Sequence, residues 1–107
     1  DFASTIPRAD AIYMTRVQDE WDKNPGESDT IDISQFSFRE EHLRVLPPDA
    51  VLMHPFPRRE EIATEVDHDP RAVYWRQMRN GMWVRVALIA GLFGREQAIL
   101  DYHDTNV

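Results

Sequence analysis

The segment AVLMHPFPRREE, from Ala50 to Glu61, decides how this chain folds. Its beginning, Ala50–His54, is a short apolar run of the kind that forms a buried strand. Pro55 and Pro57 follow, and prolines so close together cannot lie inside a helix or a central strand. The sequence therefore predicts a strand that ends at His54 in a rigid, polar turn.

A second apolar run, Ala9–Thr15, predicts another strand. After it comes a long loop, Asp22–Gln35, rich in Asp, Ser, Pro and Gly. A helical segment follows, in which Ser37 and Glu40 have the spacing of a capping box and Pro47 would stop the helix. Strand, helix and strand in this order predict a βαβ unit, so we expect an α/β fold with a parallel sheet.

The last part of the chain reads as helix. Asp69 can cap a helix, Pro70 suits its first turn, and Gly81 is expected to interrupt or end it. The next segment, Met82–Gly94, is apolar nearly all round, with Arg85 as its only charge. A helix of that composition is buried on most sides. Two strands and a few helices cannot cover it, so we expect another polypeptide segment to do so.

Length and composition restrict the class of protein. The chain has 107 residues, enough for one small domain, and a formal net charge of -7, which argues against a nucleic-acid partner. It contains no cysteine, and no apolar run approaches the roughly 18 residues that span a bilayer. The first residues lack a basic stretch followed by an apolar block, as a secretory signal would have. We expect a soluble, cytoplasmic protein without a membrane partner.

The two predicted strands each end in a polar segment, where open α/β sheets bind their ligands. Arg16 and Gln18 follow the first strand and are two residues apart, so in an extended segment their side chains point the same way. A guanidinium and an amide together suit a carboxylate ligand. The alternative is that Arg16 is an ordinary surface or ion-pairing residue.

The turn after the second strand offers a different kind of contact. Pro55 and Pro57 remove two backbone donors and fix the backbone, which leaves rigidly aimed carbonyls for a substrate's amino or amide group. The alternative is a stiff structural turn. His54 could act as a base, although a lone histidine is more often structural.

The remaining histidines do not indicate a metal site. His42, His68 and His103 lack a metal-ligand spacing with one another, and His68 lies between two aspartates in a segment that reads as loop surface. No glycine-rich stretch is typical of a phosphate-binding loop. We expect neither a metal nor a cofactor.

Three segments together resemble the C-terminal part of the aspartate carbamoyltransferase family. They are YMTRVQ (Tyr13–Gln18), MHPFPRREEIATEVD (Met53–Asp67) and NGMWVRVALIAGLF (Asn80–Phe93), in the family's order and with its gaps. The related ornithine carbamoyltransferases usually carry a His-Cys-Leu-Pro turn, so the His-Pro-Phe-Pro-Arg turn favours the aspartate enzymes.

The resemblance implies a fold, a reaction and site residues. The fold is part of a three-layer, parallel-sheet (Rossmann-like) aspartate-binding domain that ends in a long apolar helix. The reaction joins carbamoyl phosphate and L-aspartate into N-carbamoyl-L-aspartate and phosphate, without cofactor or metal, in pyrimidine biosynthesis. Arg16 and Gln18 match residues that hold the aspartate side-chain carboxylate. Pro55 and Phe56 match positions whose carbonyls contact the carbamoyl amide, and the Phe56–Pro57 bond is expected to be cis.

The resemblance also implies partners. Residues 1–107 correspond to a single, partial domain, and residues 82–93 to a helix that packs on the upstream carbamoyl-phosphate domain. The phosphate-binding motif and the catalytic histidine of the family belong upstream, so this chain supplies no catalytic residue, is expected to be inactive alone, and belongs in a homotrimer of complete subunits.

Two positions depart from the family pattern. Asp19 and Trp21 stand where basic residues usually flank the glutamate after the glutamine. This departure supports a competing hypothesis, that the chain is a non-catalytic binding or assembly module derived from the family. The retention of Arg16, Gln18 and the proline turn supports the enzyme.

Overall fold

The structure is a computed structural model that describes residues 2–18, 20, 22–26, 28–30 and 32–106. Asp19 and Trp21, the two departures from the family pattern, lie outside the described residues. The chain divides into two compact units, residues 1–75 (unit 1) and residues 76–107 (unit 2).

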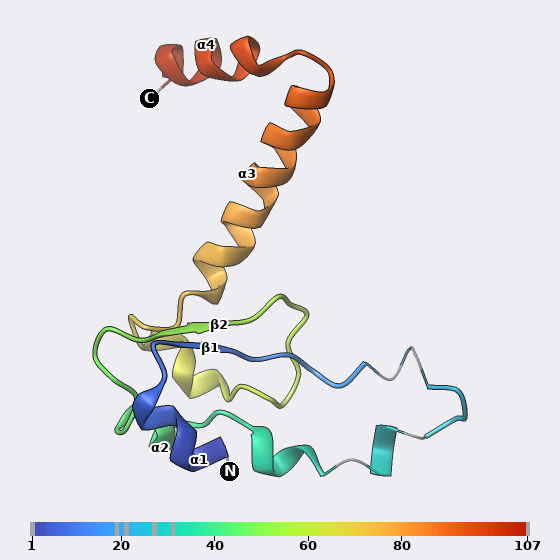
Figure 1. The fold of residues 1–107 in the computed structure, drawn as a ribbon, viewed down its shortest axis with the longest axis vertical. Coiled ribbons are helices and arrows are strands. Elements are labelled where there is room, and N and C mark those ends of the chain that lie inside the picture. The colour runs from blue at the N-terminus through green and yellow to red at the C-terminus, as the bar shows by residue number, and fades with distance from the viewer. Residues whose placement is uncertain (1, 19, 21, 27, 31, 107) are drawn as a thin grey trace. The chain divides into compact units, whose positions relative to one another are not determined.

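Unit 1 contains a two-stranded parallel sheet of β1 (Ala11–Tyr13) and β2 (Val51–Met53), shown side by side in Figure 1. Ile12 pairs with Leu52 at the centre of the register. The prediction of two short strands in a parallel α/β arrangement is confirmed. Because the strands are parallel, the segments that follow them leave from the same edge of the sheet, and Met14 N–H still donates to the Met53 carbonyl at 2.9 Å.

The elements around the strands are short. Helices α1 (Phe2–Thr5) and η1 (Ile6–Arg8) precede β1, and η3 (Ser28–Thr30), η4 (Ile33–Phe36) and α2 (Glu40–Leu43) lie on the way to β2. The helix predicted from Ser37 to Pro47 is therefore a single α-helical turn, and the prediction of a Ser37 cap was wrong. Ser37 is buried at the end of η4, while Phe38 next to it pairs with Ile62 in an isolated parallel bridge. The helix begins only after Arg39, whose N–H donates to His42 Nδ1 at 3.0 Å.

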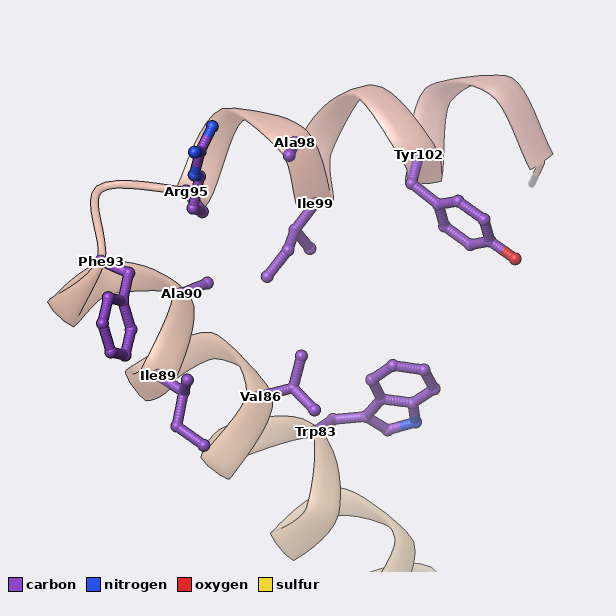
Figure 2. Close-up of a pocket in the computed structure, with 9 residues that line it drawn as sticks. All are labelled: Trp83, Val86, Ile89, Ala90, Phe93, Arg95, Ala98, Ile99 and Tyr102. Atoms are coloured by element: carbon purple, nitrogen blue, oxygen red, sulfur yellow. The ribbon is translucent and has the colours of Figure 1, made fainter.

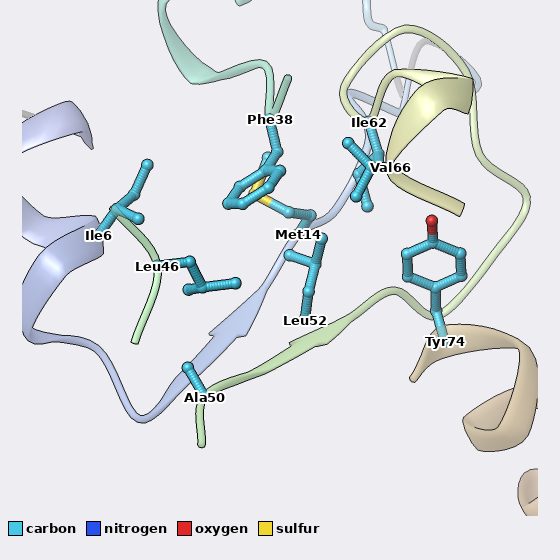
Figure 3. Close-up of a cluster of buried hydrophobic side chains, with 9 residues drawn as sticks. All are labelled: Ile6, Met14, Phe38, Leu46, Ala50, Leu52, Ile62, Val66 and Tyr74. Atoms are coloured by element: carbon cyan, nitrogen blue, oxygen red, sulfur yellow. The ribbon is translucent and has the colours of Figure 1, made fainter. Parts of the chain in front are cut away.

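Buried apolar side chains from β2, from the residue just after β1 and from the surrounding segments form the core of unit 1 (Figure 3). They are Ile6, Met14, Phe38, Leu46, Ala50, Leu52, Ile62, Val66 and Tyr74. Each fully buried Val, Leu, Ile, Phe or Met side chain among them contributes about 1.5–3 kcal/mol to folding. The core thus fixes β1, β2 and the segment that follows the proline turn against one another.

The segment between η5 (Thr64–His68) and α3 (Tyr74–Leu92) differs from its prediction. Asp69 does not cap α3, because its carboxylate accepts from the backbone N–H of Arg71 at 2.9 Å and from its Nε at 2.8 Å. The Arg71 guanidinium in turn donates to the carbonyls of Leu43 at 3.0 Å and Leu46 at 2.5 Å, where α2 ends. This arginine supplies the donors that the end of a helix lacks.

Unit 2 consists of the greater part of α3 and of α4 (Glu96–Asn106). Gly81 was expected to interrupt or end a helix and does neither, because one glycine costs a helix only about 1 kcal/mol relative to alanine. Gly94 ends α3 instead. It has φ of 60°, and the N–H of Arg95 donates to the Ala90 carbonyl at 2.8 Å, as in a Schellman motif. The following helix α4 was not predicted, so the long apolar helix is not the last element of the chain.

No helix in the described part of the chain combines the length and the apolar character that crossing a membrane requires.

Candidate functional site

The candidate site begins with the segment that follows β1. The Arg16 side chain is only 13% exposed, and its guanidinium pairs with the carboxylate of Glu20 and donates to the Val17 carbonyl at 3.2 Å. Gln18 is exposed. The guanidinium is thus held at the carboxyl edge of the sheet, in contact with a carboxylate.

A cavity of about 320 Å³ lies beside this segment. It is lined by Phe2, Tyr13, Met14, Thr15, Arg16, Val17, Phe36 and Glu61. Arg16 and Glu61 are the charged members of this lining, and they come from the segments after β1 and β2. Gln18, Pro55 and Phe56 are not among the described lining residues, so of the four predicted site residues the cavity includes Arg16 alone.

The turn after β2 has an unusual backbone. The Phe56–Pro57 bond is cis, which confirms the prediction. Phe56 has φ of 58°, in the left-handed region that few residues other than glycine adopt. Pro55 is exposed and Phe56 is half-buried, with its ring against those of His54, Tyr74 and Trp75 at centroid distances of 5.5, 5.9 and 4.9 Å. A non-glycine residue in this conformation must be held there by its surroundings.

His54 is one of the residues that hold Phe56 in this conformation. The residue is 1% exposed, and its Nδ1 accepts the backbone N–H of Phe56 at 2.9 Å. Its Nε2 lies 2.6 Å from Oε1 of Glu61, which is 5% exposed. Because Nδ1 accepts a hydrogen bond, the ring proton belongs on Nε2, where it is donated to the carboxylate. Both ring nitrogens are therefore engaged, which leaves neither available as a base toward a substrate.

A second network fixes the far side of the turn. The Arg58 guanidinium forms a two-pronged pair with the carboxylate of Asp67, with one N–O distance of 3.0 Å, and it lies 5.6 Å from the ring centroid of Tyr74. The Tyr74 hydroxyl also donates to Asp67. The hydrogen bond from Arg58 holds the pKa of the Asp67 carboxyl below its ordinary value, while burial raises the pKa of the Tyr74 hydroxyl. Arg58 is thus a structural residue of this turn.

Neither network is visible in the sequence. There His54 has no evident partner, because Glu61 is seven residues away and meets it only once the proline turn has formed. The sequence signal for the His54–Glu61 pair was a histidine and a glutamate on either side of the two prolines. Among the described residues, no three His, Cys, Asp or Glu side chains are grouped as a metal site would require.

Unit 2 has a separate feature, an apolar groove of about 770 Å³ between α3 and α4 (Figure 2). We call it the α3–α4 groove. It is lined by Trp83, Val86, Ile89, Ala90, Phe93, Arg95, Ala98, Ile99 and Tyr102. No side chain in the described part of unit 2 is buried, and Phe93 is 75% exposed.

Two parallel strands whose polar C-terminal segments leave the sheet at one edge form an α/β arrangement, and open α/β sheets bind their ligands at such an edge. The family model described as "Aspartate/ornithine carbamoyltransferase, Asp/Orn binding domain" matches residues 1–92, and the chain belongs to this family.

Relatives with known names agree with this assignment. The chain is 44% identical over 97 residues to an aspartate carbamoyltransferase catalytic subunit of Bifidobacterium longum, covering 90% of this chain and 30% of that one. It is 41% identical over 90 residues to the multifunctional protein CAD of Squalus acanthias, covering 84% of this chain and 4% of that one. The chain thus spans only about a third of the length of the bacterial relative.

Solved structures are similar as well. The aspartate transcarbamoylase of Trypanosoma cruzi in complex with carbamoyl phosphate superposes with a TM-score of 0.71 at 32% identity, over 81% of this chain and 28% of that one. The same enzyme with aspartate and phosphate gives a TM-score of 0.66 at 33% identity, over 81% and 24%. The resemblance to the aspartate enzymes that the sequence motifs indicated is confirmed.

Proposed function

We propose that this chain is the aspartate-binding part of an aspartate carbamoyltransferase. The enzyme would join carbamoyl phosphate and L-aspartate: the aspartate amine attacks the carbamoyl carbon, the carbon–oxygen bond to phosphate breaks, and the amine loses a proton. The product, N-carbamoyl-L-aspartate, belongs to pyrimidine biosynthesis. The observation that carries the proposal is the position of Arg16 and the proline turn after two adjacent, parallel strands.

Arg16 would bind the side-chain carboxylate of aspartate. Its pairing with Glu20 supports this role, because the guanidinium is already in contact with a carboxylate at the edge of a cavity. A substrate carboxylate would take the place of Glu20 on the two-donor face of the guanidinium. Gln18, two residues further on and exposed, would add a neutral donor.

Pro55 and Phe56 would contact the carbamoyl amide through their carbonyls. The fixed backbone of the turn supports this role, since carbonyls held before the substrate arrives need no ordering when it binds. The position of Phe56, packed against His54, Tyr74 and Trp75, supports it further.

The remaining parts of the proposal concern the complete enzyme. Residues 1–107 would form part of a three-layer domain, and the apolar segment of residues 82–93 would pack on the carbamoyl-phosphate domain. The exposure of Leu92 (85%) and Phe93 (75%) supports such a contact, because large exposed apolar patches usually mark an interface. A homotrimer rests on the family resemblance alone, and a cytoplasmic location stays an expectation from the sequence composition.

The same exposed surface favours the second candidate, a non-catalytic assembly module that docks through unit 2. The two candidates differ in what Arg16 does. An assembly module would join the carbamoyl-phosphate-binding polypeptide without any use of aspartate, whereas the enzyme needs both.

Arg16→Ala in the complete enzyme tests the proposal. Losing a charged hydrogen bond to a carboxylate costs about 1.5–3 kcal/mol, so we expect kcat/KM for aspartate to fall by roughly 10- to 150-fold. Carbamoyl phosphate binding should change little, and Gln18→Ala should act in the same direction but less. Arg8→Ala, at an exposed arginine of η1, is the matched control. Unchanged aspartate saturation in Arg16→Ala would show that Arg16 is structural.

A further inference from the structure

The peptide unit between Pro55 and Phe56 is oriented by a side chain. The Phe56 N–H donates to Nδ1 of His54 at 2.9 Å. Since this peptide is planar and trans, its carbonyl, which belongs to Pro55, points away from the N–H. The acceptor on His54 therefore fixes the direction of the Pro55 carbonyl. Pro57 has no N–H, so Phe56 has the last backbone donor before the turn closes.

We propose that His54 is a positioning residue of the carbamoyl subsite, and that its neutral ring, protonated on Nε2, aims the Pro55 carbonyl at the substrate amide. This inference rests on the proposed function, because it assigns His54 a role in the same site. His54 is not a catalytic residue: it is 1% exposed and both ring nitrogens are engaged within the protein.

Glu61 keeps the ring in the required state. Its Oε1 accepts from His54 Nε2 at 2.6 Å and from the backbone N–H of Arg59 at 3.1 Å. The carboxylate thus selects the tautomer in which Nδ1 is free of a proton and can accept from Phe56. The Glu61 backbone is itself anchored, since its carbonyl accepts from Phe38 N–H at 2.8 Å.

The aromatic neighbours of Phe56 hold its side chain but cannot aim its backbone amide. The rings of Tyr74 and Trp75 lie 5.9 and 4.9 Å from the Phe56 ring, on the side-chain end of the residue. The N–H at the other end has His54 as its acceptor. A change that removes only this acceptor should leave the packing in place and free the Pro55 carbonyl to rotate.

Two substitutions of His54 separate the roles of its nitrogens. In His54→Asn the amide oxygen lies close to the place of Nδ1 and can accept from Phe56, while the contact to Glu61 is lost. In His54→Gln the longer amide can donate to Glu61, while the acceptor for Phe56 is lost. Each variant gives up one buried hydrogen bond, so a merely structural role predicts similar thermal unfolding and similar activity for both.

The experiment measures kcat, KM for aspartate and thermal unfolding of both variants in the complete enzyme. Losing one hydrogen bond that acts on the transition state corresponds to roughly tenfold, so we expect His54→Gln to lose about tenfold or more in kcat. His54→Asn should stay within about threefold of the parent kcat. The KM for aspartate should change by less than about threefold in both. Equal losses in kcat, or a greater loss in His54→Asn, would overturn the proposal.

A measurement without substitution covers the case in which a variant fails to fold. Nitrogen-15 NMR of histidine-labelled enzyme reports which ring nitrogen carries the proton. We expect the Nε2–H tautomer for His54, and a proton on Nδ1 would overturn the proposal. Carbamoyl aspartate formation by the parent enzyme separates the proposed function from the proposed role of His54. Its absence would contradict the proposed function, whereas normal turnover with indistinguishable His54 variants would contradict the role of His54 alone.

Discussion

Asp67→Ala should destabilise the protein strongly, because Asp67 holds the far side of the proline turn in place. Its carboxylate accepts two bonds from Arg58 and one from Tyr74. The side chains of Arg58 and Asp67 are 12% and 22% exposed, so this pair is closer to a buried than to a surface ion pair. Breaking a buried pair costs about 3–5 kcal/mol, and exposed pairs contribute about 0–1 kcal/mol.

The expected loss in the free energy of unfolding is about 3 kcal/mol. That figure lies near the lower end of the buried range because Arg58 keeps its contacts with the rings of Tyr74 and Trp75, at 5.6 and 5.8 Å. Cation–π contacts of this kind contribute about 0.5–1 kcal/mol, so the Arg58 charge stays partly compensated after its carboxylate partner is removed. A change of about 3 kcal/mol lowers the ratio of folded to unfolded protein by roughly 150-fold.

Urea unfolding of the complete enzyme, followed by tryptophan fluorescence, measures this loss. Trp75 lies beside the network and contributes to the signal. Asp32→Ala is the matched control, because Asp32 is an exposed aspartate whose carboxylate accepts from Ser34 N–H at 3.1 Å. A loss for Asp67→Ala no larger than for Asp32→Ala would refute the view that the Arg58–Asp67–Tyr74 network stabilises the turn.

Two further predictions concern the same part of unit 1. Arg71→Ala should lower the free energy of unfolding by about 1.5–3 kcal/mol in the same urea assay, because the carbonyls of Leu43 and Leu46 lose a charged donor. Arg71→Lys keeps the charge without the planar guanidinium, so its free energy of unfolding should lie between those of the parent and the alanine variant. Equal values for all three proteins would contradict the capping role of Arg71. Hydrogen bonds from Arg58 and Arg71 lower the pKa values of the Asp67 and Asp69 carboxyls. The stabilisation from these two ionised carboxylates should therefore be complete above the ordinary pKa of about 4, and should be lost as the pH falls through the lowered pKa values. Thermal unfolding between about pH 6 and 2 checks this, and Asp67→Asn should flatten the acid side of the curve; an unchanged slope would count against Asp67 as a source of it.

The strands and the turn could be predicted from the sequence because their determinants are local. Apolar runs bounded by polar residues indicated β1 and β2, and Pro55 and Pro57 excluded a helix or a continuing strand at the turn. The motifs of the family added the cis bond, which neither composition nor periodicity carries.

The errors at helix ends arose where a side chain had two uses. Asp69 was expected to cap a helix, but its carboxylate binds Arg71, which no local pattern shows. Ser37 has the spacing of a capping residue, yet it lies next to Phe38, whose burial and pairing with Ile62 keep that stretch extended. Gly81 lies within α3, where its cost is small beside that of interrupting a long helix.

Of the candidate site, the sequence predicted the place of Arg16 after a strand, but not the geometry around it. Arg16 lines a cavity at the sheet edge, as its position after a strand indicated. The pairing of His54 with Glu61 depends on the path of the turn between them, so it became visible only in three dimensions. The roles of Gln18, Pro55 and Phe56 toward substrates stay predictions.

Formation of carbamoyl aspartate from carbamoyl phosphate and aspartate tests the central claim most directly. The assay compares the purified 107-residue chain alone with the same chain combined with the whole upstream remainder of an aspartate carbamoyltransferase, including its carbamoyl-phosphate domain, alongside size-exclusion chromatography. Placing two substrates against each other supplies roughly 7–11 kcal/mol of barrier lowering, which half a site cannot provide. We predict no turnover and self-association or poor stability for the chain alone, and a stable, active complex for the mixture. Turnover by the monomeric chain would contradict the account. A complex that assembles from both polypeptides and forms no carbamoyl aspartate would contradict it as well.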